Sequence, residues 1–152
     1  MFARRAPERL VRFWDTSALV PLLILERGTP AAARWLREDP VVIVWTLSRV
    51  ELLSALARHR REAPQDAAIL TAARRDLRDA WERWSEVTAV DVVRQQAERI
   101  VEIYPLKAAD ALQIGAALVA ARQNPALHEF VTFDQALATS AEGEGLRVLT
   151  SR

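Results

Sequence analysis

The stretch RFWDTSALV, residues 12–20, joins two local patterns that together indicate the fold. It begins with bulky apolar residues typical of a buried strand, and after an aspartate and two hydroxyl residues it continues as an apolar helix. Asp15 therefore lies at a junction between a strand and a helix, where aspartate is a favoured N-cap. The same place suits an acidic site, because ligands of parallel α/β sheets bind at the carboxyl ends of the strands.

Apolar strands and helices alternate along the rest of the chain. This alternation predicts βαβ units, an α/β fold in which a mainly parallel sheet carries helices on both faces. Strands are expected at residues 10–14, 41–45, 87–93 (a short strand or a connector), 129–134 and 146–150, and helices at 17–26, 28–38, 48–61, 64–84, 94–104, 107–122 and 135–141. Within the helices we expect Thr29 as an N-cap before Pro30, Pro21 within about the first turn, and Gly143 as a C-cap.

The composition is that of one folded domain. With 152 residues, of which 51% are hydrophobic and 27% charged, the chain is long and apolar enough to bury a core. It has no cysteine, which excludes disulfides, thiolate metal ligands and a thiol nucleophile, and its two histidines give little support to a zinc site. No apolar run approaches the roughly 20 residues that span a bilayer, and no signal peptide is recognisable, so we expect a cytoplasmic protein.

The basic residues are nearly all arginine and gather in two clusters, RHRR at 58–61 and RRDLR at 74–78. The net charge of +1 says little about nucleic acid by itself. Arginine binds phosphate through two parallel hydrogen bonds, which favours a phosphate-binding role for the clusters. A solvated helix face, or a bias in genome base composition, also explains them, and the sequence leaves these alternatives open.

Four carboxylates are candidates for an acidic site: Asp15, Glu51, Asp110 and Asp134. Asp134 follows a strand just as Asp15 does, and both are suited to cap the next helix. Glu51 comes three residues after Ser48, which is the spacing of a capping box. Taken singly, these three acids are better explained as caps than as catalytic residues.

Asp110 has the weakest structural explanation, because it lies in LKAADALQIGAAL, a helix with almost no polar face. An ionised carboxylate there should lie in, or at the rim of, an apolar environment, which is unfavourable unless a partner or a metal ion compensates. Lys107 at i−3 and the helix dipole offer only weak compensation. We therefore favour a functional role for Asp110.

Together the four acids predict a site for a hard divalent cation at one end of the sheet. Four carboxylates close together would repel one another without cations. Their oxygens suit Mg²⁺, with Mn²⁺ as an alternative, in octahedral coordination completed by substrate phosphates. The hydroxyls of Thr16 and Thr132, which lie next to or near Asp15 and Asp134, are expected to support the ligands or to cap the helices.

Four segments, WDTSALV, SRVELLSAL, LKAADALQIGAAL and FVTFDQALA, occur in the order and approximate spacing of the PIN-domain ribonucleases. They most closely resemble the toxins of VapBC-type toxin–antitoxin pairs. Each segment carries one of the four acids, which makes the resemblance specific. It covers residues 12–149 and implies a single PIN domain over residues 1–152, with residues 1–10 as an N-terminal extension and a PIN-like three-layer α/β/α architecture.

The resemblance implies an endoribonuclease that hydrolyses RNA phosphodiester bonds with Mg²⁺ or Mn²⁺. Asp15 and Asp110 match the family's principal metal ligands. Glu51 and Asp134 complete the catalytic and metal-binding cluster, directly or through water, and Thr16 matches the hydroxyl that follows the first acid. No side-chain nucleophile is needed for this reaction.

Basic residues near the acids are expected to bind RNA phosphates. Arg58, Arg60 and Arg61 end the helix on which the second acid lies, about 10–15 Å away, and Lys107 precedes the third. Lys107 and Gln113 depart from the family pattern, in which arginine and histidine are common at these places. We expect these departures to affect substrate contacts rather than the chemistry.

The resemblance also implies two protein partners, a cognate antitoxin that occludes the site and a second copy in a homodimer. Trp81 and Trp84, at i,i+3 on one helix, suit either a groove for such a partner or the core. Two other functions remain open: an inactive PIN-like interaction module whose acids are only caps, and a magnesium-dependent phosphotransfer or phosphatase domain. The second fits less well, because Lys107 precedes a helix instead of ending a strand and no DxDxT motif is present.

Overall fold

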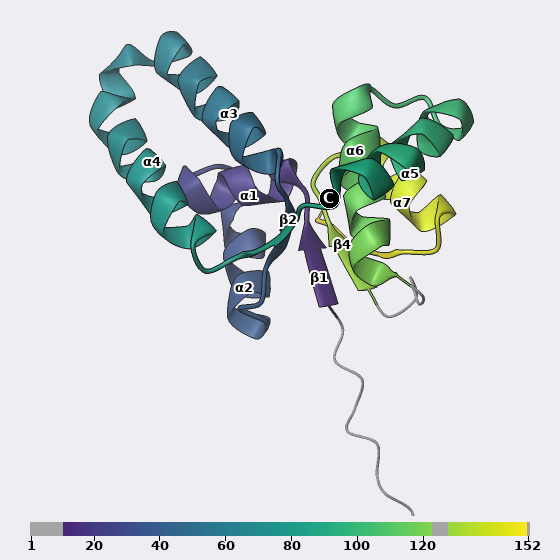
Figure 1. Ribbon diagram of the computed structural model, residues 1–152. Helices are drawn as coiled ribbons and strands as arrows, with labels where there is room; N and C mark the ends of the chain where they lie inside the picture. Colours follow the sequence, from purple (N-terminus) through teal and green to yellow (C-terminus); the bar gives the residue numbers. More distant parts are fainter. Residues whose placement is uncertain (1–10, 123–127, 152) are drawn as a thin grey trace, which may run out of the picture.

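The fold is described from a computed structural model that defines residues 11–122 and 128–151 (Figure 1). The elements in chain order are β1 (Val11–Trp14), α1 (Thr16–Leu23), α2 (Thr29–Glu38), β2 (Ile43–Trp45), α3 (Ser48–Glu62), the 3₁₀ turn η1 (Pro64–Asp66), α4 (Ala67–Trp81), β3 (Ser85–Val87), α5 (Val90–Ile103), α6 (Ala108–Ala121), β4 (His128–Val131), α7 (Gln135–Gly143) and β5 (Arg147–Leu149). The expected N-terminal extension, residues 1–10, lies outside the described residues. Within those residues, no helix combines the length and apolar character needed to cross a membrane.

The five strands form one parallel sheet in the order β3-β2-β1-β4-β5. β1 is central, and at its end Trp14 pairs with Val131 at the end of β4. The parallel order brings the carboxyl ends of all strands to one edge of the sheet. The segments that leave β1 and β4, which carry Asp15 and Asp134, therefore emerge side by side at this edge.

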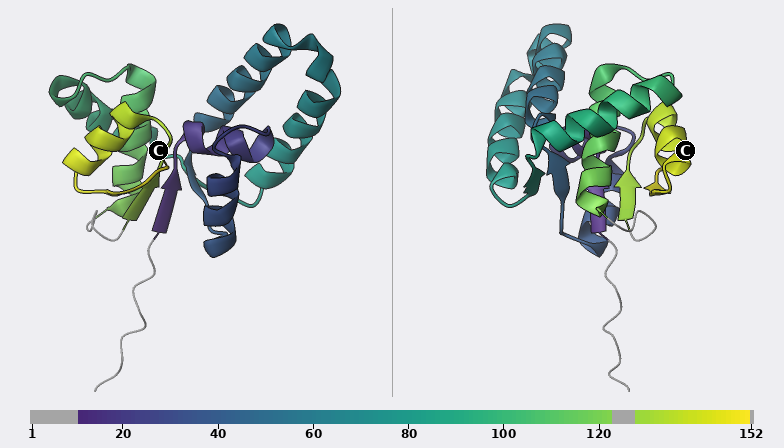
Figure 2. Two further views of the ribbon diagram at one scale, coloured as in Figure 1. Left: turned by 180° about the vertical axis from the view of Figure 1, so that it is seen from behind. Right: turned by 45° about the vertical axis from the view of Figure 1, so that its right-hand side comes forward.

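Helices cover both faces of the sheet. α1 to α4 lie on one face and α5, α6 and α7 on the other, and α3 and α4 form a projecting hairpin (Figures 1 and 2). Side chains alternate along a strand, so Trp14 enters the core on the first face, with Trp35 and Leu52, and Phe13 enters the second core, with Ile114. The expected three-layer α/β/α architecture with a parallel sheet is confirmed.

The turn between α1 and α2 differs from the expectation. α1 begins at Thr16, so Pro21 lies in its second turn and not in the first. Gly28, not Thr29, occupies the N-cap position of α2. The Thr29 hydroxyl instead donates to the carbonyl of Pro21 (2.7 Å) and accepts from the N–H of Glu26 (2.9 Å). It closes this turn from inside, a use of threonine that competes with capping.

The middle of the chain also corrects two predicted boundaries. The helix expected at 64–84 is divided into η1 and α4 and stops at Trp81, because Ser85–Val87 pair with β2 as an edge strand. The strand or connector expected at 87–93 is wrong from Val90 onward, where α5 begins. β-branched residues suggest a strand here, but Val93 is buried in the second core as part of a helix.

Gly143 is the last residue of α7 and not its C-cap, which is Glu144. It lies in the helix, and the left-handed residue that follows is Gly145, with φ of 89°. Gly143 is small for a different reason, since a Cβ there would lie 2.6 Å from the hydroxyl of Tyr104. The glycine permits close packing where a C-cap was expected.

Candidate active site

The four predicted acids line one pocket, with a volume of about 510 Å³, at the carboxyl edge of the sheet. Asp15 follows β1 and Asp134 follows β4, so the strands themselves deliver these two. Glu51 lies in the first turn of α3 and Asp110 in the first turn of α6, from opposite faces of the sheet. The fold therefore brings all four together, as the sequence predicts.

Asp15 is both a helix cap and a member of this pocket. It is 2% exposed, and its Oδ2 accepts hydrogen bonds from the Ser17 N–H (3.2 Å), the Ser17 hydroxyl (2.5 Å) and the Thr132 hydroxyl (3.0 Å). None of these three hydrogen bonds goes to the other oxygen, Oδ1. One oxygen thus orients the side chain and the second is left for a ligand.

The pKa values of three acids are raised. Burial raises the pKa of Asp15 to about 6, against the lowering effect of its bonds to Ser17 and Thr132, and the Asp110 charge adds to the rise. Burial also raises the pKa of Glu51, and the charges of Asp15 and Asp110 add to it. For Asp110, burial acts first and the charge of Asp134 second. The acids therefore repel one another across the pocket, and a cation would relieve that repulsion.

Gln113 holds Glu51 in place, a role that the sequence did not predict. Its Nε2 lies 3.0 Å from Glu51 Oε1 and 2.9 Å from the hydroxyl oxygens of Thr16 and Ser48. The capping box expected for Ser48 and Glu51 is therefore absent: α3 has no side-chain cap, and both side chains turn to the glutamine. Gln113 is fully buried, and its bond to Glu51 orients that acid. Its Oε1 is buried without a partner among the described residues.

Thr132 and Asp134 connect the two strand ends. The Thr132 hydroxyl donates to Asp15 and accepts from the Asp134 N–H at 3.0 Å. Asp134 also caps α7, because its Oδ1 accepts from the Leu137 N–H at 3.0 Å. Thr132 thus bonds an acid directly, whereas the Thr16 hydroxyl bonds Gln113.

The predicted RNA-binding residues fall into two groups. Arg58 lines the acid pocket, as expected. Arg60 and Arg61 instead line a separate pocket between α3 and α4, together with Arg74. Lys107 is exposed at the start of α6, and its charge lowers the pKa of Asp110. Helical spacing predicted that these arginines lie near the end of α3 but not the face on which each lies.

The two tryptophans of α4 and its end pack against the core. Trp81 is 6% exposed and its indole N–H donates to Glu86 at 2.6 Å. Trp84 is partly buried against the first core and meets Trp81 edge-on at 6.0 Å. This favours core packing over a partner groove for the pair.

The oxygen donors of the pocket suit a hard cation, although the acidic side chains do not converge on one point. Among residues 11–122 and 128–151, no three acidic or histidine side chains converge on a single point as a metal cluster. The pocket does provide four carboxylates, including Asp15 with an oxygen that its neighbours leave unused. Carboxylate oxygen is the ligand that Mg²⁺ and Mn²⁺ prefer. The residues present fit such an ion.

This fold and this set of acids define a PIN domain, and the PIN domain family model matches residues 12–143. The chain belongs to the PIN domain family. Within it, the chain is similar to the VapC-type ribonucleases: "Ribonuclease VapC45" and "Ribonuclease VapC49" of Mycobacterium tuberculosis are each 30% identical over 136 residues, covering 90% of this chain and 92% of each relative. The resemblance to VapC-type PIN proteins is thereby confirmed.

Two solved structures share the fold. PAE2754 from Pyrobaculum aerophilum has a TM-score of 0.63 at 20% identity, covering 96% of this chain and 92% of that chain. FitAcB from Neisseria gonorrhoeae has a TM-score of 0.56 at 14% identity, covering 91% and 96%. At these identities the likeness supports the architecture alone.

Proposed function

We propose that this protein is a metal-dependent endoribonuclease, the toxin of a toxin–antitoxin pair. The observation that carries the proposal is the pocket in which four carboxylates from β1, α3, α6 and the end of β4 meet. The relatives named as VapC ribonucleases support RNA as the substrate. A purely structural set of caps would not require acids on both faces of the sheet to line one pocket.

Asp15 and Asp110 are the principal residues that would hold the ion, completed by Glu51 and Asp134. We propose Mg²⁺ as the ion, with Mn²⁺ as the alternative, since both take carboxylate oxygens. When bound, such an ion lowers the pKa of a ligand water and neutralises charge on the phosphate. The chain's own part is to present the acids in fixed orientations.

Hydrogen bonds hold two of these acids in their orientations. Ser17 and Thr132 fix Asp15 through one oxygen, and Gln113 fixes Glu51. Arg58, on the pocket wall, is placed to bind a phosphate of the RNA. Lys107, close to Asp110, is proposed to bind a neighbouring phosphate, whereas Arg60 and Arg61 would reach only RNA that extends over the α3–α4 hairpin.

We further propose a cognate antitoxin that covers the acid pocket and a homodimer of this chain in the cytoplasm. These proposals follow from the similarity to VapC-type proteins. An inactive interaction module is the alternative, and it predicts that replacing a pocket acid changes no activity. The phosphotransfer reading receives no support from the family to which the chain belongs.

The test is metal-dependent cleavage of RNA. The purified protein is incubated with a structured RNA pool and a matched DNA pool in EDTA, and Mg²⁺ or Mn²⁺ is then added back in excess. We expect RNA cleavage only after the metal is restored, and much slower cleavage of DNA. Equal cleavage in EDTA would contradict metal dependence, and a preference for DNA would contradict the proposed substrate.

A further inference from the structure

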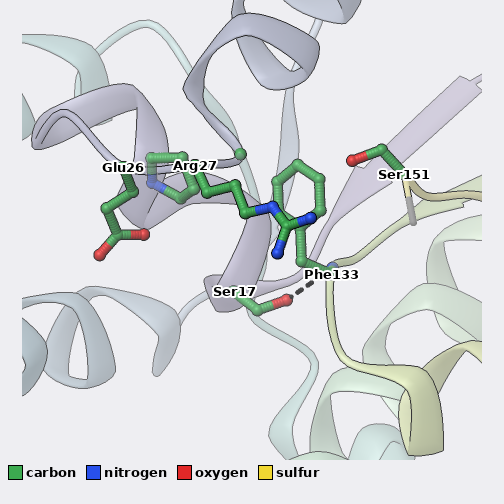
Figure 3. Close-up of a pocket in the computed structure, with 7 residues that line it drawn as sticks. Ser17, Glu26, Arg27, Phe133 and Ser151 are labelled. Carbon is green, nitrogen blue, oxygen red and sulfur yellow. Dashed lines mark hydrogen bonds between the residues drawn. The ribbon is translucent and has the colours of Figure 1, made fainter.

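A second pocket opens at the same edge of the sheet and is part of no function considered so far. It has a volume of about 490 Å³ and lies between the start of α1, the turn before α2, and the ends of β4 and β5. Ser17, Arg27, Gly28, Phe133 and Ser151 are among its lining residues (Figure 3). We call this the aromatic pocket, after Phe133.

Phe133 is tied to the acid site by its own backbone. It lies between Thr132 and Asp134, and its N–H donates to the Ser17 hydroxyl at 3.0 Å, the hydroxyl that itself donates to Asp15. The Phe133 ring is stacked on Trp35, with ring centres 5.5 Å apart and 25° between the planes. The ring is therefore held rigidly on one side while the residue remains partly exposed on the other.

Shared lining residues place this pocket next to the acid pocket. Ser17 lines the aromatic pocket, the acid pocket and a third pocket of about 370 Å³ along α1. The third pocket shares Glu26 with the aromatic pocket, and Val20 and Arg58 with the acid pocket. The three pockets are therefore neighbours along α1, and Arg58 lies at the border of the acid pocket and the third pocket.

Arg27 and Phe133 line the aromatic pocket together. Arg27 extends across it, with the guanidinium near Phe133, while the Glu26 carboxylate points away (Figure 3). Arg27 is exposed and has no ion pair with any other described residue. An aromatic ring on a rigid support and a free guanidinium are the two surfaces on which nucleobases stack.

Gly28 lies against the edge of the Phe133 ring and helps to set the position of the ring. A Cβ at this position would lie 2.9 Å from Cε2 of Phe133, closer than two carbons can approach. The backbone at Gly28 has φ of −77° and ψ of −11°, which any residue adopts, so glycine is not needed there for its conformational freedom. The small residue allows the edge of the Phe133 ring to pack against it, and a larger residue would displace the ring.

We propose that the aromatic pocket binds one unpaired nucleobase of the RNA, adjacent to the phosphodiester that lies at the acids. The base stacks on Phe133 and Arg27, and the hydroxyl of Ser151 meets its polar edge. The pocket therefore selects RNA that is single-stranded at this nucleotide. This inference deepens the proposed function and rests on it for the identity of the polymer, but its first test requires no cleavage.

The first test is binding of mononucleotides to the full chain in EDTA, followed by NMR amide shifts. The probes are AMP, GMP, CMP and UMP, with ribose 5-phosphate as the probe that lacks a base. We expect the nucleotides to shift the amides of Arg27, Gly28 and Phe133, and ribose 5-phosphate to leave them in place. Equal shifts with ribose 5-phosphate would show a phosphate site, and no shift with any nucleotide would show no base site; either result overturns the proposal.

Variants can distinguish the aromatic face of Phe133 from its apolar volume. Phe133→Leu keeps an apolar side chain against Trp35 but removes the aromatic face, and Gly28→Ala adds a methyl group that displaces the ring. Both should weaken nucleotide binding, roughly 5- to 150-fold for the loss of one stacked base, whereas Phe133→Tyr should retain it. Arg37→Ala, which removes an exposed arginine of α2 outside the pocket, is the matched control for Arg27→Ala. Unchanged binding by Phe133→Leu would contradict the proposal.

The second test couples the pocket to cleavage. Once a cut site is mapped, RNAs with a single abasic nucleotide at each flanking position are compared for wild type and Phe133→Leu. One position should slow the wild type by roughly 5- to 150-fold and have little further effect on the variant. Cleavage without any such coupling would contradict the base site and leave the proposed nuclease function unaffected. Nucleotide binding that depends on Phe133, in a protein that cleaves no RNA, would support the base site and contradict the proposed nuclease function.

Discussion

Asp15 shows how one side chain can serve a helix and a site together. Its Oδ2 accepts three hydrogen bonds, from Ser17 and Thr132, and this fixes the carboxylate plane. Its Oδ1 accepts none of them. Capping and the proposed role as a metal ligand are therefore compatible, because these hydrogen bonds use only one of the two oxygens.

Replacing this carboxylate should stabilise the metal-free protein at neutral pH. Burial raises the pKa of folded Asp15 to about 6 from an ordinary 3.8. Between these pH values the folded protein retains a proton that the unfolded chain has lost, so the free energy of unfolding falls as pH rises through this window. At pH 7.5 the loss is about 3 kcal/mol at most. Asp15→Asn, which keeps the acceptor for Ser17, should recover part of it.

The measurement is urea unfolding of both proteins in EDTA at pH 7.5 and pH 4. The advantage of Asp15→Asn should be large at pH 7.5 and should shrink at pH 4. Adding Mg²⁺ at pH 7.5 should stabilise the wild type more than the variant. A variant that is less stable than the wild type at pH 7.5 in EDTA would contradict this account of the buried charge.

Gln113 should set the pH at which Glu51 loses its charge. Its hydrogen bond lowers the pKa of Glu51 against the raising effect of burial. Gln113→Leu removes that bond, so the Glu51 pKa should rise and the acidic limb of the cleavage profile should move to higher pH. Gln95→Leu, an exposed glutamine of α5, is the control. An unmoved pH profile in a folded Gln113→Leu protein would show that the bond does not tune Glu51.

At the scale of elements, α3 presents two different faces. Glu51, Ala55 and Arg58 follow one another at helical spacing and line the acid pocket. Arg60 and Arg61 turn toward α4. The sequence places all three arginines on one helix end, and only the packing of α3 against α1 and α4 separates them.

This separation predicts unequal effects on RNA binding. Arg58→Ala should weaken binding of single-stranded RNA and reduce the slope of log affinity against log salt by roughly 0.7, the value for one phosphate contact. Arg60→Ala removes the same charge from the same helix and should have a smaller effect on short RNA. Affinities measured over a range of salt concentrations test this. Equal slopes for the two variants would contradict the assignment of Arg58 to the substrate path.

Local sequence patterns predicted the parts of the fold that depend on neighbouring residues. The strands at 11–14 and 43–45 and the acids at strand ends follow from apolar runs and turn chemistry. The edge strand Ser85–Val87 does not, because its identity depends on pairing with Ile43–Trp45, about 40 residues away. Gln113 was visible as the one polar residue among the apolar residues 111–121, but its role depends on three side chains brought in by other helices.

At the scale of the whole molecule, one sheet joins two cores. Neighbouring residues of β1, Phe13 and Trp14, enter opposite cores, so neither core can open without disturbing the central strand. We expect the chain to unfold as the single domain that its sequence predicts. In urea, tryptophan fluorescence, which reports mainly on the first core, and far-UV circular dichroism should follow one shared transition. Two separated transitions would show that the layers are independent units.

The central claim is that the acid pocket performs the reaction, and one substitution tests it most directly. Asp110→Asn nearly preserves the shape of a side chain that has little structural role, while Asp91→Asn changes an exposed acid in the first turn of α5 and is the matched control. Both variants and the wild type are incubated with the structured RNA pool, with Mg²⁺ and with EDTA. The account predicts that wild type and Asp91→Asn cleave RNA only with the metal and that folded Asp110→Asn does not cleave it. Cleavage by Asp110→Asn at the wild-type rate would contradict the account.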